Sequence, residues 1–381
     1  MNVPKLRFKE FNDEWQPINL ADIFQYFSTN SLSREKLSES GILKNLHYGD
    51  IHRKYNSIVN ENKEITSYVK DLNYVNKYEL LKNNDLIFAD ASEDYKGIGK
   101  AVEVVNVNNN TVSGLHTILV RDNSNVFAPM FKGYYFNSPT VHNQIRVLAN
   151  GFKVYGISKE VINKLNIKIP SINEQSKIAN TLYLLDEKIE LQTKKIEDLK
   201  LFKLYIRKKI FSSNTNNNIR LKEIVNCESS NITLADIEND NGIYPVYGAT
   251  GFIKNIKNYK FDSEYIAIVK DGAGVGRTMI CPKNSSILTT MNALTIKNNY
   301  PLNYICEMIN TISFDKYIVG SGIPHIYFKD YGNEEFMLHN ENDANKFDSV
   351  FKCLDRKIEL LNVSLDKLNI LKKGLMQGMF V

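Results

Sequence analysis

The segment Lys270–Thr278, KDGAGVGRT, places three glycines within five positions before an arginine and a threonine. Backbone N–H groups of such loops can surround a phosphate, which would make the protein a nucleotide-binding enzyme. That chemistry needs the spacing G-x-x-x-x-G-K-[ST] between a strand and a helix. Here the interval from Gly272 to Gly276 is one residue too short, and Arg277 replaces the lysine. The next residues, MICPKNSSILTT, suit a strand and a loop, so we predict a tight turn between strands.

Other side chains that could carry chemistry do not form a recognisable catalytic group. The six histidines include no H-E-x-x-H motif, and the four cysteines include no C-x-x-C pair. The sequence NSPT at Asn137–Thr140 lacks the second proline and the aromatic residue of the N-P-P-[YF] loop in DNA amino-methyltransferases. Asp90, Glu93 and Asp94 form an acidic cluster for which we favour a solvated turn over a metal site. We predict neither a catalytic residue nor a metal site.

The composition is that of an ordinary globular protein. The chain has 381 residues, of which 43% are hydrophobic and 24% charged, with a formal net charge of +5. This length allows two or three domains, and the positive charge is compatible with nucleic acid as a partner. The sequence contains neither an apolar run long enough to span a membrane nor a secretory signal, so we predict a cytoplasmic protein.

The chain contains a long internal repeat. Residues 185–211 align without a gap with residues 354–380, at an offset of 169, and 9 of the 27 positions are identical. A repeat of this length indicates that the chain consists of two related halves.

Both repeated segments show the periodicity of a long helix. Apolar residues recur at intervals of three and four, which forms a narrow stripe that needs a partner helix. We predict that packing involves Ile178, Leu182, Leu185, Ile189, Ile196 and Leu199 in the first helix, and Phe347, Phe351, Leu354, Ile358, Leu361, Leu365 and Leu368 in the second. Ser171–Glu174 has the pattern of a capping box, and Asn340–Asp343 occupies the equivalent four positions. The two helices most simply pack on each other; the alternative is separate docking on two globular domains.

The segments that precede the helices also correspond. Ile18–Phe24 resembles Ile219–Val225, and we expect a short helical turn in each. Asp85–Val104 and Glu264–Ile280 each contain an apolar run, a Gly-x-Gly-basic tetrad and a second apolar run. These regions are rich in Ile, Val, Tyr and Thr, which is typical of strands. The order is therefore globular, helix, globular, helix.

Three motifs together resemble one known family. They are I-P-x-x-x-E-Q-x-x-I-A at Ile169–Ala179, L-x-x-L-D-x-x-I at Leu182–Ile189 and P-K-L-R-F at Pro4–Phe8. The chain resembles the specificity subunits of type I restriction–modification enzymes over essentially its whole length. It departs from the pattern in the second half, where Asp343-Ala344 replaces the Glu174-Gln175 of the first half.

The resemblance implies an α+β fold with an internal pseudo-two-fold repeat. Two β-rich target-recognition domains, residues 1–168 and 213–338, would alternate with two long helices, residues 169–212 and 339–381. The helices would pair as an antiparallel coiled coil.

The resemblance also implies a function without catalysis in this chain. The protein would read a bipartite target in double-stranded DNA with an unread gap, and would scaffold two methyltransferase subunits and the restriction subunits. This chain would hold no cofactor, whereas S-adenosylmethionine, ATP and Mg would be bound by the partner subunits. Two alternatives remain open. One is a self-contained DNA methyltransferase or nuclease, and the other is a coiled-coil interaction protein without DNA binding.

Candidate DNA contacts come from basic and amide side chains near predicted turns, since Lys and Arg bind phosphates, and Arg, Lys, Asn and Gln read bases. In the first half they are His52, Arg53, Lys54, Lys96, Lys100, Arg146 and Lys153. In the second half they are Lys254, Lys270, Arg277, Asn292, Lys316 and His325.

Overall fold

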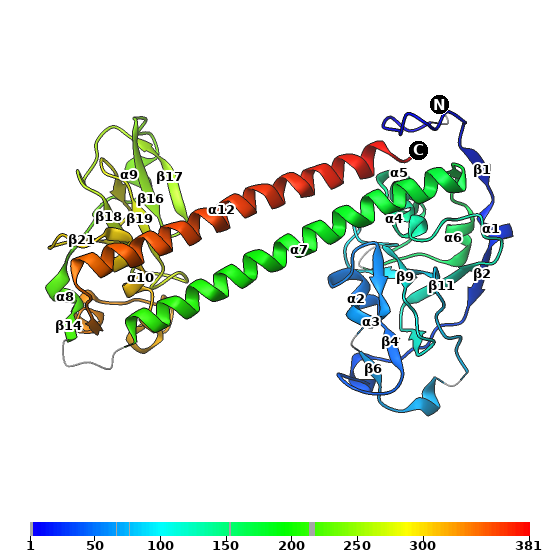
Figure 1. Ribbon diagram of the computed structural model, residues 1–381, viewed down its shortest axis with the longest axis horizontal. Helices are drawn as coiled ribbons and strands as arrows, with labels where there is room; N and C mark the ends of the chain where they lie inside the picture. The colour runs from blue at the N-terminus through cyan, green and yellow to red at the C-terminus, as the bar shows by residue number, and fades with distance from the viewer. Residues whose placement is uncertain (1–2, 66, 76, 152–153, 213–217) are drawn as a thin grey trace. The chain divides into compact units, whose positions relative to one another are not determined.

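The computed structural model describes residues 3–65, 67–75, 77–151, 154–212 and 218–381. The chain divides into two compact units (Figure 1). The first is built from two separate stretches of sequence and the second from one continuous stretch. Unit 1 comprises residues 1–192 and 364–381, and unit 2 comprises residues 193–363. Each unit therefore contains one globular region and a part of both long helices.

Unit 1 is organised around a five-stranded sheet with the order β2-β11-β7-β9-β5. The strands are β2 (Phe24–Phe27), β11 (Thr117–Asp122), β7 (Leu86–Ala89), β9 (Ala101–Val105) and β5 (Ile58–Asn60). Neighbouring strands are antiparallel except β5 and β9. Successive side chains of β7 enter two different cores, Leu86 and Phe88 on one face and Ile87 and Ala89 on the other. Both faces of the sheet are thus covered, as the apolar sequence of β7 requires.

Helices cover the first face of this sheet. They are α4 (Phe131–Phe136), α5 (Pro139–Leu148) and α6 (Lys159–Asn163), together with parts of the two long helices. Trp15, the only tryptophan of the chain, is fully buried in this core against the rings of Phe131 and Tyr135.

Unit 1 also contains a smaller sheet with the strand order β10-β4-β6-β3. Its strands are β10 (Thr111–Ser113), β4 (Lys44–Leu46), β6 (Tyr68–Val69) and β3 (Leu37–Ser38). Between β4 and β6 the chain forms α2 (Tyr48–Arg53), β5 and α3 (Glu61–Glu64). The remaining elements of unit 1 are β1 (Gln16–Ile18), α1 (Leu20–Ile23), η1 (Arg34–Lys36), η2 (Leu72–Tyr74), β8 (Ala91–Ser92), β12 (Tyr155–Gly156) and β13 (Ile167–Ile169).

Unit 2 repeats the two sheets in reduced form. Its main sheet has the order β15-β21-β18-β19 and its small sheet the order β17-β16-β20. The strands are β15 (Val225–Ser229), β21 (Met291–Ile296), β18 (Tyr265–Val269), β19 (Thr278–Cys281), β17 (Gly251–Ile256), β16 (Tyr244–Gly248) and β20 (Ser286–Ile287). In both small sheets one pair is parallel, β10 with β4 and β20 with β16. The strand orders therefore correspond, and the strand-rich repeat predicted from sequence is present.

The other elements of unit 2 complete the repeat. They are β14 (Asn218–Arg220), α8 (Leu221–Ile224), α9 (Leu234–Ile237), α10 (Leu302–Ile309), η3 (Phe314–Tyr317), α11 (Phe328–Tyr331) and β22 (Glu335–Met337). The short helical turns expected in Ile18–Phe24 and Ile219–Val225 are α1 and α8.

The two predicted long helices are α7 (Ile172–Phe211) and α12 (Glu341–Gly378). In unit 1 the last turns of α12 lie near the first turns of α7 (Figure 1). The Phe380 ring lies against the rings of Phe131 and Tyr135. In unit 2 the end of α7 packs with the start of α12, and Phe211 lies against Tyr304 and Phe351. The helices are thus antiparallel neighbours within each unit, and the thirteen side chains predicted to pack are all buried or half-buried.

The helix starts differ from the predicted capping pattern in one respect. Ser171 Oγ accepts a hydrogen bond from the Glu174 N–H, as a cap should. The Glu174 carboxylate, however, binds the Arg7 guanidinium through both oxygens, at 2.7 Å each. In the second half Asn340 caps α12 by accepting from the Asp343 N–H. The motif residue Glu174 therefore attaches the N-terminal P-K-L-R-F segment to α7.

Candidate nucleic-acid interface

The glycine-rich segment of unit 2 is the turn of the β18–β19 hairpin, which we name loop A of unit 2 (residues 270–277). Gly272 and Gly276 have φ angles of +93° and +83°, which side-chain-bearing residues rarely adopt. A Cβ atom at Gly276 would also overlap the Phe314 side chain. A strand follows this loop, so no helix N-terminus is available for a nucleotide phosphate. The glycines form a tight turn, as the sequence predicts.

A second loop lies against loop A and is named loop B of unit 2 (residues 319–325). Val319 and His325 close it by exchanging two backbone hydrogen bonds of 2.9 Å. Loop B is attached to loop A because Gly272 N donates to Pro324 O and Ile326 N donates to Lys270 O. The His325 ring also pairs with the Asp271 carboxylate.

Unit 1 contains the same pair of loops. Its loop A (residues 90–100) leads from β7 to β9, and its loop B is closed by two backbone bonds between Asn150 and Gly156. These two residues precede Val319 and His325 by 169 positions each, the offset of the helical repeat. Ile157 N donates to Asp90 O just as Ile326 N donates to Lys270 O. The paired loops are therefore a repeated structural feature of the two halves.

A third segment, which we name connection C, adjoins loop A in each unit. It joins two strands of the small sheet: in unit 2 it is the turn Ala249–Thr250, and in unit 1 it is residues 47–67. The basic residue of each Gly-x-Gly-basic tetrad reaches connection C. Arg277 donates to Ala249 O at 3.2 Å, and Lys100 donates to Tyr55 O at 2.5 Å. In each unit loop A is therefore hydrogen-bonded to connection C and to loop B or the residue that follows it, and we name these three segments together the candidate DNA surface.

Comparison with known proteins identifies this arrangement. The family profile described as "Type I restriction modification DNA specificity domain" matches the chain twice, over residues 12–201 and 214–369. The chain belongs to this family. Specificity subunits of type I restriction–modification systems recognise DNA sequence and are not catalytic, and the same holds for this member.

Solved structures show the same fold over the whole chain. An S subunit of a type I restriction–modification system from M. genitalium shares 18% identity, with a TM-score of 0.63 over 100% of this chain and 99% of that chain. A second solved structure, described as the "Structural basis underlying complex assembly and conformational transition of the type I R-M system", shares 14% identity. Its TM-score is 0.56 over 97% of this chain and 98% of that one. The search of curated proteins returned no significant match.

In this specificity subunit most of the predicted DNA contacts have charged groups at the surface. The exposed or half-exposed ones are Arg53, Lys54, Lys96, Arg146, Lys254, Lys270, Arg277 and Lys316. Some of these groups already have partners: Lys254 donates to Glu238 O, Lys270 lies near Asp271, and Lys316 pairs with Glu334. Among them, Lys96 lies in loop A of unit 1, Lys270 and Arg277 lie in loop A of unit 2, and Arg146 lies in α5 just before loop B. Lys153 lies outside the described residues.

Three other candidates have their polar groups committed inside the protein. Lys100 Nζ donates to the carbonyls of Tyr55 and His52 at the end of α2, and burial lowers the pKa of its ammonium group. His52 Nε2 donates to Ala91 O at 2.9 Å, and His325 pairs with Asp271. In this conformation these side chains fix the loops to one another, so we assign them to loop positioning.

Asn292 needs a correction. It lies in β21, between β15 and β18, and is buried, so its amide cannot reach a base edge in this structure. β21 pairs with β15 on one side and with β18 on the other, and this place inside the sheet buries the Asn292 side chain. We withdraw Asn292 as a base-reading candidate.

The structure adds surface residues that sequence reasoning missed. Tyr95 in loop A of unit 1 is exposed, packs on Tyr155 with 5.0 Å between ring centroids, and donates to Arg146 O. Phe252, two residues after the turn of connection C in unit 2, is also exposed. Aromatic residues next to basic ones at turns are the signal that could have indicated them, because aromatic rings can stack on bases or wedge between them.

The described part of the chain holds no group of three or more His, Cys, Asp or Glu side chains placed to bind a metal. Over the same residues no helix is long and apolar enough to cross a membrane.

Proposed function

We propose that the chain reads a bipartite target in double-stranded DNA, one half with each unit. The first target-recognition domain would comprise residues 1–168 and the second residues 213–338, with helical regions 169–212 and 339–381. The observation that carries this proposal is the repeat of loop A, loop B and connection C in both units. Two equivalent surfaces with different side chains can read two different half-sites, since loop residues contact the base edges.

We further propose that the paired helices set the length of an unread gap between the half-sites. α7 has 40 residues, which corresponds to about 60 Å at a rise of 1.5 Å per residue. Successive major grooves on one face of B-DNA are about 34–36 Å apart, so helices of this length can span one helical turn of DNA. The apolar stripe of each helix supports a rigid pairing.

Matched insertions into both helices test this ruler. Seven helical residues would be added after Gln192 and after Val363, where the helices pass from one unit to the other. A heptad keeps the apolar stripe in phase and lengthens each helix by about 10 Å, or about three base pairs. The target would be measured by sequencing the DNA methylated by the complex. The expected result is unchanged half-sites with a longer gap, whereas an unchanged gap contradicts the ruler. An insertion into α7 alone should disrupt the pairing.

Methyltransferase subunits, two per chain, would bind along the helices, and restriction subunits would join that core. Support comes from exposed apolar residues at sequence-equivalent positions of both helices: Leu191 and Leu360, Leu201 and Ile370, and Phe202 and Leu371. Exposed apolar side chains on a helix favour a partner surface. The partners would bind S-adenosylmethionine, ATP and Mg.

Charge substitution tests this assembly. Phe202→Glu alone or Leu371→Glu alone should remove one methyltransferase subunit per complex, and the double variant should remove both. Native mass spectrometry measures the stoichiometry, and full occupancy in the double variant would exclude these positions from the interface. The chain alone, given DNA and labelled S-adenosylmethionine, should transfer no methyl group.

A further inference from the structure

Connection C is much longer in unit 1 than in unit 2. In unit 2 the two residues Ala249 and Thr250 join β16 to β17, whereas in unit 1 residues 47–67 contribute α2, β5 and α3. This insertion is attached to loop A in two places, because His52 donates to Ala91 O and Lys100 donates to the carbonyls at the end of α2. The insertion therefore extends the candidate DNA surface of unit 1 only.

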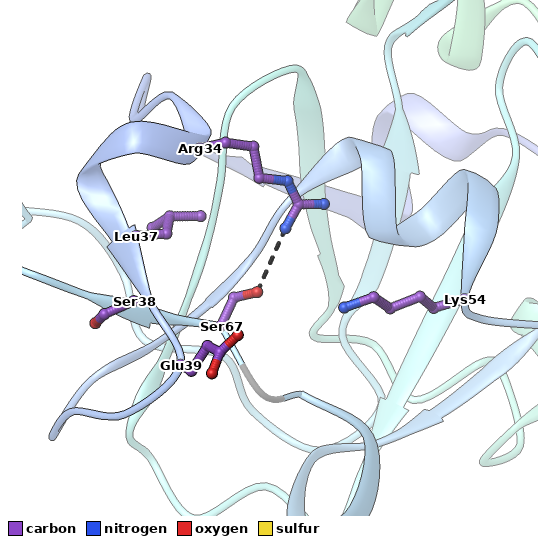
Figure 2. Close-up of a pocket in the computed structure, with 6 residues that line it drawn as sticks. All are labelled: Arg34, Leu37, Ser38, Glu39, Lys54 and Ser67. Atoms are coloured by element: carbon purple, nitrogen blue, oxygen red, sulfur yellow. Dashed lines mark hydrogen bonds between the residues drawn. The ribbon is translucent and has the colours of Figure 1, made fainter. Parts of the chain in front are cut away.

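A pocket of about 470 Å³ lies at this extension (Figure 2). Arg34, Lys54 and Ser67 supply side-chain hydrogen-bond donors, whereas the Ser38 hydroxyl already donates to Ser40 O, and Leu37 and Glu39 complete the lining. The Arg34 and Lys54 side chains come from different segments and are 48% and 50% exposed. Arg34 Nη1 approaches Ser67 Oγ at 3.4 Å, which is a long hydrogen bond. All three donors can therefore reach a ligand in the pocket.

One buried carboxylate holds the two cations next to each other. Asp50 Oδ1 lies 2.7 Å from Arg34 Nη2 and 3.1 Å from Lys54 Nζ, and the Asp50 side chain is only 2% exposed. Hydrogen bonds from the Arg34 and Lys54 side chains lower the Asp50 pKa, against the opposing effect of burial. A single carboxylate neutralises one of two positive charges, so an anion between Arg34 and Lys54 would relieve their mutual repulsion.

We propose that this pocket binds a phosphate of the DNA backbone beside the half-site read by unit 1. The proposal rests on the proposed function, because it takes unit 1 to face DNA. A guanidinium, an ammonium and a hydroxyl are the side-chain groups that most often contact backbone phosphates. Since the insertion is absent from unit 2, the protected backbone extends further on one side of the bipartite target than on the other. Glu39 is the acidic residue of the lining, and its charge opposes phosphate binding.

Two substitutions with opposite expected signs test the pocket, both in the full-length chain assembled with its methyltransferase subunits. Lys54→Gln should weaken binding to cognate DNA several-fold and reduce the slope of log K against log salt by about 1, without changing the preferred sequence. Glu39→Gln should strengthen binding. Lys63→Gln is the matched control, because Lys63 is an exposed lysine of α3 in the same insertion that does not line the pocket. Equal effects of Lys54→Gln and Lys63→Gln would overturn the proposal, as would weaker binding by Glu39→Gln.

A methylphosphonate scan then locates the contact. Neutralising one phosphate beside the first half-site should weaken the wild-type complex and leave the Lys54→Gln complex unaffected. If no position behaves in this way while the wild-type complex still binds its target specifically, the pocket is not a phosphate site although the chain reads DNA. If the wild-type complex shows no sequence-specific binding, the proposed function itself fails.

Discussion

Lys372 Nζ in α12 lies 2.5 Å from Asp186 Oδ1 in α7, and Lys203 Nζ lies 2.5 Å from Asp355 Oδ1 in the same way. At the offset of 169, Asp186 is equivalent to Asp355 and Lys203 is equivalent to Lys372. The first pair belongs to unit 1 and the second to unit 2. The duplicated sequence thus produces one antiparallel register twice, once at each end of the helices.

The two ion pairs should contribute unequally to stability. Lys372→Met should cost less than about 1 kcal/mol, as expected for a partly exposed pair. Lys203→Met should lower the free energy of unfolding by about 2 kcal/mol, because Lys203 Nζ also lies 2.6 Å from the carboxylate of Glu307. The Glu307 side chain is only 4% exposed, and in the variant Arg207 would be its one remaining cationic partner among the described residues. Urea unfolding measures both: Trp15 fluorescence reports unit 1, and far-UV circular dichroism reports the whole chain. Equal shifts would show that Glu307 does not depend on Lys203.

The pairing of Arg7 with Glu174 should stabilise unit 1. Glu174 is 1% exposed, so Arg7→Ala would leave a buried carboxylate without its cation, at a cost of about 3 kcal/mol. The double variant Arg7→Leu/Glu174→Leu should recover most of this loss, since no buried charge then remains. Trp15 fluorescence during urea unfolding gives both values. A double variant as unstable as Arg7→Ala would mean that the packing of the side chains matters more than their charges.

Features encoded locally or by repetition could be predicted from the sequence. The periodicity of α7 and α12 required helices, and the spacing of Gly272 and Gly276 excluded a phosphate loop. Asp186 and Lys203 are among the identical positions that revealed the repeat, but their partners depend on the antiparallel register. That register becomes visible only when both helices are placed.

The candidate site could be predicted only in part, because it depends on contacts between distant segments. Lys100 and Arg277 occupy the same place in their tetrads, yet the long connection C of unit 1 holds Lys100 half-buried against two backbone carbonyls, whereas Arg277 stays exposed beside one. Arg34 and Lys54 are separated by 20 positions and share Asp50, which local patterns do not show. Side-chain burial, as at Asn292, likewise follows from the strand order.

His47 should make unit 1 less stable at mildly acidic pH. Its Nδ1 caps α2 by accepting from the Gly49 N–H at 3.1 Å, and burial, followed by the nearby Arg34 charge, lowers its pKa to about 4. The folded pKa of His47 lies below the unfolded value of about 6.5. The stabilisation that neutral His47 provides is therefore fully present above pH 6.5 and is lost as the pH falls towards 4. At pH 5 the loss should be about 2 kcal/mol.

Replacing His47 isolates this effect from the other titrating groups. Asn is a good N-cap residue and does not titrate, so His47→Asn should retain α2 and flatten the dependence of stability on pH between 5 and 7. Urea midpoints from Trp15 fluorescence at the two pH values give the comparison. The same pH dependence in the variant and the wild type would assign the loss to other groups, such as His142, whose pKa burial also lowers.

The equivalent residues Lys100 and Arg277 should affect different properties. Lys100→Gln should destabilise unit 1 by about 1–2 kcal/mol, because the carbonyls of Tyr55 and His52 lose their buried donor. Arg277→Gln should leave stability unchanged, since Arg277 is exposed and its guanidinium donates only to Ala249 O among the described residues. In the complex with methyltransferase subunits, Arg277→Gln should weaken DNA binding by about tenfold, as expected when a base or phosphate contact is lost.

Methylation profiles distinguish a base contact of Arg277 from a phosphate contact. A relaxed position in the second half-site indicates a base contact, and a uniform loss over all sequences indicates a phosphate contact. If Arg277→Gln instead lowered the unfolding midpoint and left DNA binding intact, loop A of unit 2 would serve the fold and not recognition.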